Sequence, residues 1–82
     1  MQKYLIMCRS ITQAQRVSRL LERSGLTAVT RRAPLELTGS GCGHCVIVRE
    51  RDVGRALALI RDAGIQIGKI YSVYPEYEEA PL

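Results

Sequence analysis

The feature that most constrains the fold of this chain is a short step that occurs twice, where a helical pattern ends at a glycine and an apolar residue follows. The two copies are Ser24-Gly25-Leu26 and Ala63-Gly64-Ile65. Glycine is the usual residue at the left-handed position just beyond a helix, so each copy predicts a helix end. Apolar residues recur at helical spacing before each glycine, and they are Ile11, Ala14, Val17, Leu20 and Leu21, then Val53, Ala56, Leu57, Ile60 and Ala63. The sequence therefore predicts two similar halves, each with one helix.

Extended segments flank the two predicted helices. Residues 2–8, 26–32, 44–49 and 65–74 are the candidate strands, and Ser10 and Asp52 are the candidate helix caps. Gln13 stands three residues after Ser10, which is the spacing of a capping box. Right-handed crossovers then place both helices on the same face of the sheet. We predict an α+β fold, ferredoxin-like βαββαβ, with a four-stranded antiparallel sheet and two helices on one face.

Length and composition limit the number of domains and the expected location of the protein. Eighty-two residues hold one core, so we expect a single domain over residues 1–75 and an acidic C-terminal tail over residues 76–82. No apolar run approaches the ~18 residues that a membrane span needs, and the N-terminal residues have no small-residue cleavage site. We therefore expect a cytoplasmic protein with reduced thiols. The open second face of the sheet predicts a homodimer.

The net charge of +4 predicts a surface that concentrates anions. Arg16, Arg19 and Arg23 lie three and four residues apart, on one side of the first helix, and a solvated helix face accounts for them. An RNA-recognition sheet needs aromatic residues on its third strand for base stacking. Segment 44–49 has none besides His44, and the chain contains no Phe or Trp. Nucleic acid is therefore not an expected partner.

The segment Cys42-Gly43-His44-Cys45 is the candidate functional site, because it holds two of the three cysteines and the only histidine. It ends a loop over residues 33–43, which is longer than the two to five residues or so that a simple hairpin needs. Successive N–H groups in a glycine-rich loop can form an anion-binding nest that also stabilises a thiolate. We expect Cys42 to be the exposed nucleophile, with Ser40, Gly41 and Gly43 shaping this nest.

Alternation along segment 44–49 predicts that His44, Val46 and Val48 face one side of the sheet, and Cys45 and Ile47 the other. His44 is a candidate proton donor or acceptor near neutral pH, or a strand-end residue at the water boundary. Cys45 is a candidate resolving thiol, or a small apolar strand residue, since free cysteine is commonly buried.

Three chemistries are open for these thiols. A redox dithiol fits the Cys-x-x-Cys spacing, but thioredoxin-like proteins place it at a helix N-terminus, whereas this motif precedes a strand. A metal site could use Cys42, His44 and Cys45, but it lacks the fourth ligand usual for Zn²⁺ unless two chains share it. A carrier thiol would accept a sulfur or selenium atom on Cys42 and pass it on.

Several segments resemble a known family, the putative Se/S carrier protein-like proteins. The resemblance covers roughly residues 3–74 and is most specific in the loop from Pro34-x-x-Leu37-Thr38 to Cys42-Gly43. The other matching segments are Tyr4-Leu5-Ile6-Met7, Gly25-Leu26, Gly64-Ile65 and Ile70-Tyr71. Gly41 is an addition to the family pattern, and Cys45 stands where a small residue such as alanine is common.

The resemblance implies that Cys42 is the carrier position, holding selenium or sulfur as a perselenide or persulfide. We therefore expect a carrier rather than an enzyme, with no resident cofactor besides the transient atom on Cys42. The expected partners are a protein donor, such as a cysteine desulfurase, and an acceptor enzyme. The alternatives are a metal-binding module and a regulatory or adaptor domain.

Overall fold

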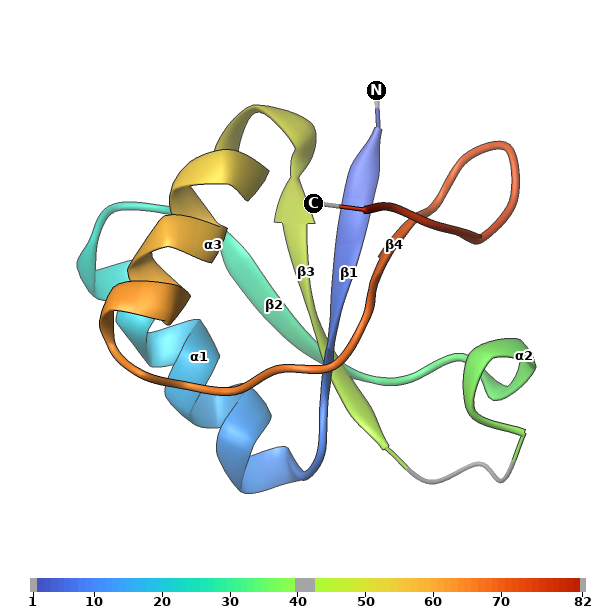
Figure 1. Cartoon of the computed structure of the whole chain (residues 1–82), viewed down its shortest axis with the longest axis horizontal. Coiled ribbons are helices and arrows are strands. Elements are labelled where there is room, and N and C mark those ends of the chain that lie inside the picture. Colours follow the sequence, from blue (N-terminus) through green and yellow to red (C-terminus); the bar gives the residue numbers. More distant parts are fainter. Residues whose placement is uncertain (1, 40–42, 82) are drawn as a thin grey trace.

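The computed structural model describes residues 2–39 and 43–81. Strands and helices alternate at first, and two short strands end the described chain (Figure 1). The elements are β1 (Lys3–Cys8), α1 (Ile11–Arg23), β2 (Ala28–Arg32), α2 (Leu35–Thr38), β3 (His44–Arg49), the 3₁₀ turn η1 (Glu50–Asp52), α3 (Val53–Asp62), β4 (Ile70–Ser72) and β5 (Glu78–Glu79).

The strands form one sheet in the order β2-β3-β1-β4-β5, and every neighbouring pair is antiparallel. β1 lies in the middle and pairs with β3 along its whole length, from Lys3 opposite Arg49 to Cys8 opposite His44. Helices α1 and α3 lie on the same side of this sheet (Figure 1). The α+β class with an antiparallel sheet is confirmed, while the finer ferredoxin-like assignment stays a prediction.

Among the described residues the sheet has five strands rather than the four expected. The fifth is β5, which comes from the segment expected to be an acidic tail and pairs Glu79 with Tyr71. The next residue continues this contact, because the Ala80 N–H donates to the Ile70 carbonyl at 2.8 Å. β4 would otherwise be an edge strand with unpaired backbone groups, and the chain end satisfies them.

Both helices end as the repeated glycine step predicts. Gly25 has a φ of 85°, its N–H donates to the Glu22 carbonyl at 3.0 Å, and the Leu26 N–H donates to the Leu21 carbonyl at 3.0 Å. This is the Schellman pair of hydrogen bonds. The same pair, 3.0 and 3.2 Å long, ends α3 around Gly64 at a φ of 72°.

The start of α1 also follows the prediction. The Ser10 hydroxyl accepts from the Gln13 N–H at 3.1 Å, and the Gln13 side-chain oxygen accepts from the Arg9 N–H at 2.7 Å. The Gln13 amide also donates to the Gln66 carbonyl, which ties this helix start to the segment after α3. Asp52 occupies the predicted cap position of α3, but its side chain makes no capping hydrogen bond within the described chain, because η1 runs directly into the helix.

The core lies between the sheet and helices α1 and α3. Its fully buried side chains include Ile6, Val17, Leu21, Val46 and Ile60. Burying each such side chain stabilises the fold by about 1.5–3 kcal/mol relative to leaving it exposed. Val46 and Val48 both belong to this core, as the alternation along β3 predicts.

The predicted fourth strand is much shorter than residues 65–74, since β4 covers only Ile70–Ser72. The residues just before β4 still run against β1, because the Gly68 N–H donates to the Met7 carbonyl at 2.7 Å. A Cβ at Gly68 would lie 3.2 Å from the Met7 Cβ and 3.3 Å from its carbonyl oxygen. The absence of a side chain at Gly68 therefore permits this close approach of two backbones.

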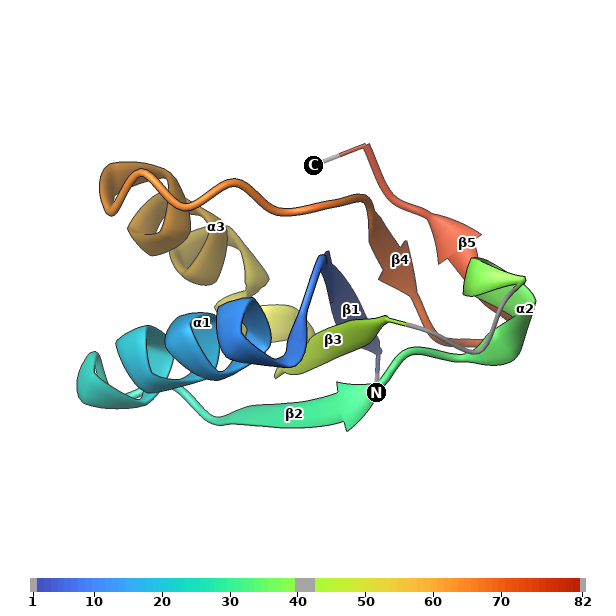
Figure 2. The same ribbon diagram turned by 90° about the horizontal axis from the view of Figure 1, so that it is seen from below.

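The second face of the sheet is also covered, although α1 and α3 lie on the other side. Figures 1 and 2 both place α2 on the side away from these helices. Leu5 and Cys45 point to this second face, yet they are only 3% and 1% exposed. The segment between β4 and β5 is held by Gln2, whose side chain accepts from the Val73 and Tyr74 N–H groups at 2.9 Å each and donates to the Tyr74 carbonyl at 2.8 Å. No helix in the described chain is long and apolar enough to cross a membrane.

Candidate functional site

The predicted carrier loop is described only in part. Cys42, Ser40 and Gly41 lie outside the described residues. Gly43, the last loop residue before β3, has a φ of 120°, and its carbonyl accepts from the Ala33 N–H at 3.1 Å. This positive φ is a conformation that favours glycine over any residue with a side chain.

The space around Gly43 is limited as well. A Cβ there would lie 3.4 Å from the Thr38 Cγ2 and 3.8 Å from the Ala33 Cβ. Thr38 ends α2, and Ala33 follows β2, so the two sides of the loop close on each other at Gly43. The described part of the loop is therefore anchored at the point where it joins β3.

Cys45 points to the second face of the sheet, opposite Met7 of β1 and Arg31 of β2. It is a free cysteine with only 1% of its surface exposed. Burial raises the pKa of the Cys45 thiol, and the positive charge of Arg31 offsets part of that rise. Cys45 is therefore held as a thiol at neutral pH, as expected for a small apolar strand residue.

Cys8 points to the helix side and belongs to the core. It is 7% exposed, and its thiol donates to the Ile6 carbonyl at 3.6 Å. Burial raises the pKa of the Cys8 thiol from 9.0 to about 11, with a smaller contribution from nearby Cys45. Both described cysteines thus disfavour the thiolate that a sulfur nucleophile requires.

His44 begins β3, opposite Cys8 of β1 and Arg32 of β2. The residue is half-buried, and its Nδ1 atom is buried without a hydrogen-bond partner in the structure as described. Buried polar atoms normally have a partner, so this nitrogen has an unused hydrogen-bonding capacity. The role of His44 as a proton donor or acceptor stays a prediction.

The structure separates His44 from Cys45, because successive side chains of β3 point to opposite faces of the sheet. One ion held by both side chains of a single chain is therefore disfavoured. Over residues 2–39 and 43–81, no group of three or more His, Cys, Asp or Glu side chains is arranged to hold a metal ion.

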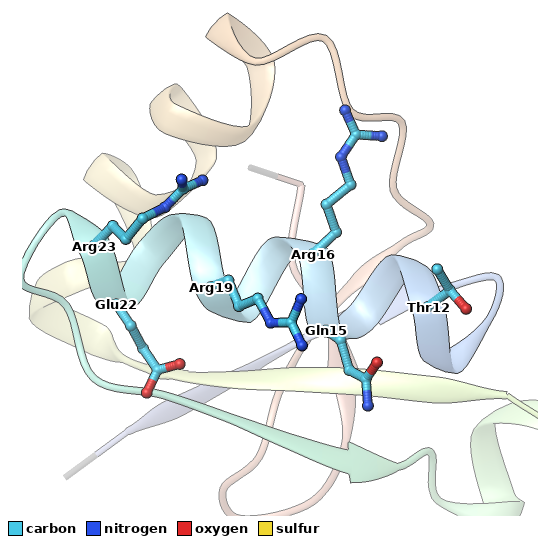
Figure 3. A pocket seen from close by; sticks show the side chains of 6 residues that line it. All are labelled: Thr12, Gln15, Arg16, Arg19, Glu22 and Arg23. Carbon is cyan, nitrogen blue, oxygen red and sulfur yellow. The ribbon is translucent and has the colours of Figure 1, made fainter.

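A shallow groove of about 780 Å³ runs along the outer surface of α1 (Figure 3). Arg16 and Arg23 extend from one edge of the helix, while Arg19 and Gln15 lie along the other. These arginines are exposed, and none forms an ion pair within the described chain. The side of α1 that carries the arginines is therefore a solvated surface, as predicted. All residues that line the groove belong to α1, and they enclose no cavity.

A second cavity, of about 320 Å³, was not expected from the sequence. It lies on the second face of the sheet, between β1, β2, β3 and the segment after β4. Tyr74 and Tyr77 line it from that segment, and Tyr77 belongs to the part of the chain that we expected to be an acidic tail. The tyrosines flanking Pro75 were the available sequence signal, since aromatic residues commonly mark a packed segment.

The fold and the cysteines together define a small α+β protein in which two thiols are sealed and a third follows a glycine-rich stretch. A family model described as putative Se/S carrier protein-like matches residues 3–72. The chain therefore belongs to the putative Se/S carrier protein-like family. No curated protein and no solved structure matches the chain.

Proposed function

We propose that this protein carries a single selenium or sulfur atom on Cys42. Membership of the Se/S carrier family supports this function. The observation that supports Cys42 as the residue is the burial of Cys8 and Cys45, whose raised pKa values make both poor nucleophiles at neutral pH while they stay buried. Cys42 is then the remaining thiol, and it follows Gly39-Ser40-Gly41 in the sequence.

The loading step is a transfer between sulfur atoms. The Cys42 thiolate attacks the terminal sulfur of a donor persulfide, R–S–SH, and a new S–S bond forms as the old one breaks. The products are Cys42–S–SH and the donor thiolate, with no net oxidation. A donor perselenide, R–S–SeH, transfers selenium in the same way. The protein is a stoichiometric carrier in this scheme rather than an enzyme.

Two other residues of the motif have proposed roles. His44, with its unpartnered Nδ1 atom, moves a proton to or from the carrier loop. Cys45 is the resolving thiol of the release step. Its thiolate attacks the Cys42 sulfur, a Cys42–Cys45 disulfide forms, and hydrosulfide or hydroselenide leaves. In the folded state Cys45 is 1% exposed and burial raises its pKa, so this release requires β3 to open at its start and expose the Cys45 thiol to water, where it ionises more readily.

Intact-mass measurement tests the function. The protein is incubated with a cysteine desulfurase that is supplied with cysteine or selenocysteine. We expect an adduct of one sulfur or one selenium atom on the wild-type protein and on Cys8→Ser, and none on Cys42→Ser. A Cys42→Ser protein that loads as well as the wild type would refute the assignment.

The metal-binding alternative is tested with the same variants. A site built from Cys42, His44 and Cys45 would retain Zn²⁺ after purification, and each of the three substitutions would remove it. We expect no stoichiometric zinc in the wild-type protein, because His44 and Cys45 face opposite sides of β3.

A further inference from the structure

We propose that the cavity on the second face of the sheet binds a small anion with a planar aromatic body, such as a nucleoside monophosphate. The cavity holds about 320 Å³. Small-molecule sites in proteins have volumes of about 300–1,000 Å³, so this cavity is large enough for one compact ligand. Pro34 at the start of the carrier loop and Cys45 also line this cavity, but the inference does not use Cys42 or the transferred atom, so it does not rest on the carrier function.

The floor of the cavity is apolar and preformed. Leu5, Cys45 and Ile47 come from β1 and β3 and point to the second face. Leu5 and Cys45 are almost completely buried, whereas Ile47 is half-buried, so Ile47 offers most of the apolar surface that a ligand can contact on this floor. A ligand that lies there gains apolar contact without first ordering the strands beneath it.

The rim of the cavity is cationic. Lys3, Arg31 and Arg32 line it, and none of them forms an ion pair among residues 2–39 and 43–81. Arg31, opposite Cys45, points to the second face, and Arg32 follows it at the end of β2. Both are exposed, and a guanidinium group can bind a phosphate or carboxylate through paired N–H donors. Arg31 lies opposite Cys45 in the sheet, and its positive charge offsets part of the rise in the pKa of Cys45 that burial causes, so this charge lies close to the cavity floor.

Two aromatic side chains complete the lining. Tyr74 is 64% exposed, and Tyr77 is half-buried. The Gln2 side chain holds the Tyr74 backbone through hydrogen bonds of 2.8 and 2.9 Å. An exposed tyrosine ring that lines a cavity together with arginines is suited to stack on a planar base or ring.

The apolar floor, the cationic rim and the two tyrosines together favour one class of ligand, an aromatic anion. An inorganic anion would use the cationic rim and leave the apolar floor and the rings without contact. An uncharged aromatic compound would leave the arginines unused. A second copy of the chain, with a net charge of +4, would bring like charges together at this rim. An aromatic anion uses all three parts.

Amide chemical shifts of the isotope-labelled protein test the proposal, with adenosine monophosphate as the probe and adenosine and inorganic phosphate as comparisons. We expect adenosine monophosphate to shift the amides of Arg31, Cys45 and Ile47 and to bind about tenfold or more tightly than either comparison, since charge-assisted bonds and stacking both contribute. Added salt weakens this binding because the rim is exposed.

Matched variants locate the site. Removing two charges with Arg31→Gln and Arg32→Gln should weaken binding about tenfold or more. Tyr74→Ala removes the ring and keeps the backbone groups that Gln2 binds, and it should also weaken binding. The double variant Arg19→Gln and Arg23→Gln removes the same charge from the α1 groove and should leave binding unchanged.

Three results would overturn the proposal. The first is the absence of shifts in the cavity amides at any concentration of adenosine monophosphate. The second is an equal response to phosphate and adenosine monophosphate that Tyr74→Ala does not change. The third is a shift of the same amides with protein concentration alone, which would assign this face to a second copy of the chain.

Discussion

At the scale of single residues, the structure distinguishes the thiols by their surroundings. Cys8 and Cys45 lie on adjacent strands and point to opposite faces, yet both are buried and both have raised pKa values. Burial raises the pKa of the thiol on both faces of the sheet because it removes the water that would stabilise a thiolate. The burial of both thiols in the folded state supports the proposal that Cys42 is the carrier residue.

The raised pKa of Cys8 predicts a loss of stability at alkaline pH. The folded thiol keeps its proton up to about 11, whereas the unfolded thiol ionises near 9.0. The unfolded state therefore binds fewer protons between these values, and the free energy of unfolding falls as pH rises, by at most about 1.4 kcal/mol per pH unit from this group. Urea unfolding at increasing pH should show this slope in the wild-type protein and a reduced slope in Cys8→Ala. Equal slopes in the two proteins would contradict the assigned pKa.

Gly43 provides a second prediction at this scale. Gly43→Ala places a side chain at a φ of 120° and in contact with Thr38, and it should cost about 1–3 kcal/mol. Gly54→Ala is the control, since a Cβ at this helical position meets nothing within 4 Å. It should be neutral or stabilise by about 0.5–1 kcal/mol. The comparison is made by urea unfolding, and equal effects of the two substitutions would show that the Gly43 conformation is unstrained.

At the scale of elements, the covering of the second face depends on one side chain near the start of β1. Gln2→Ala removes the acceptor of the Tyr74 N–H, while the Val73 N–H still donates to the Lys3 carbonyl at 3.1 Å. We expect amide hydrogen exchange of Tyr74 to become faster than that of Val73, with the amides of α1 unchanged. Gln15→Ala, an exposed substitution on α1, is the matched control. Uniformly faster exchange across the chain would indicate global destabilisation instead.

The elements that the sequence predicts well are those with local signals. Gly25, Gly64 and Ser10 mark helix ends through hydrogen bonds within a few residues, and the structure forms these bonds. β5 could not be predicted in this way, because Glu78 and Glu79 have no strand pattern and are extended only through their pairing with β4. Tertiary contacts override local propensity in such short segments.

The candidate site, like the elements, was predictable only where its signals are local. Alternation along β3 correctly predicts that Val46 and Cys45 point to opposite faces of the sheet. The second cavity combines Arg31, Leu5 and Tyr77, which come from segments far apart in the sequence. No local pattern connects these residues, so the cavity becomes apparent only when the chain end folds back over the sheet.

At the scale of the whole molecule, the sheet separates two environments. One face packs against α1 and α3 to form the core, and the other carries Cys45 beneath a charged rim. The two described thiols are each sealed in a different environment, and the molecule should therefore have one reactive sulfur in its folded state.

Alkylation kinetics test this prediction. Iodoacetamide at neutral pH should modify one cysteine of the folded protein quickly and all three only in urea, because buried thiols with raised pKa values react slowly. Cys42→Ser should abolish the fast phase, and Cys45→Ser should retain it. A fast phase from Cys8 or Cys45 would show that the fold opens at β1 or β3.

Peptide mapping of the loaded protein locates the transferred atom, which we propose that Cys42 holds. The protein is loaded by a desulfurase, the persulfide is trapped with an alkylating reagent, and the modified peptide is sequenced by mass spectrometry. We expect the extra sulfur or selenium on Cys42 alone. An extra atom on Cys8 or Cys45, or none on any cysteine while the donor is active, would refute the carrier role of Cys42.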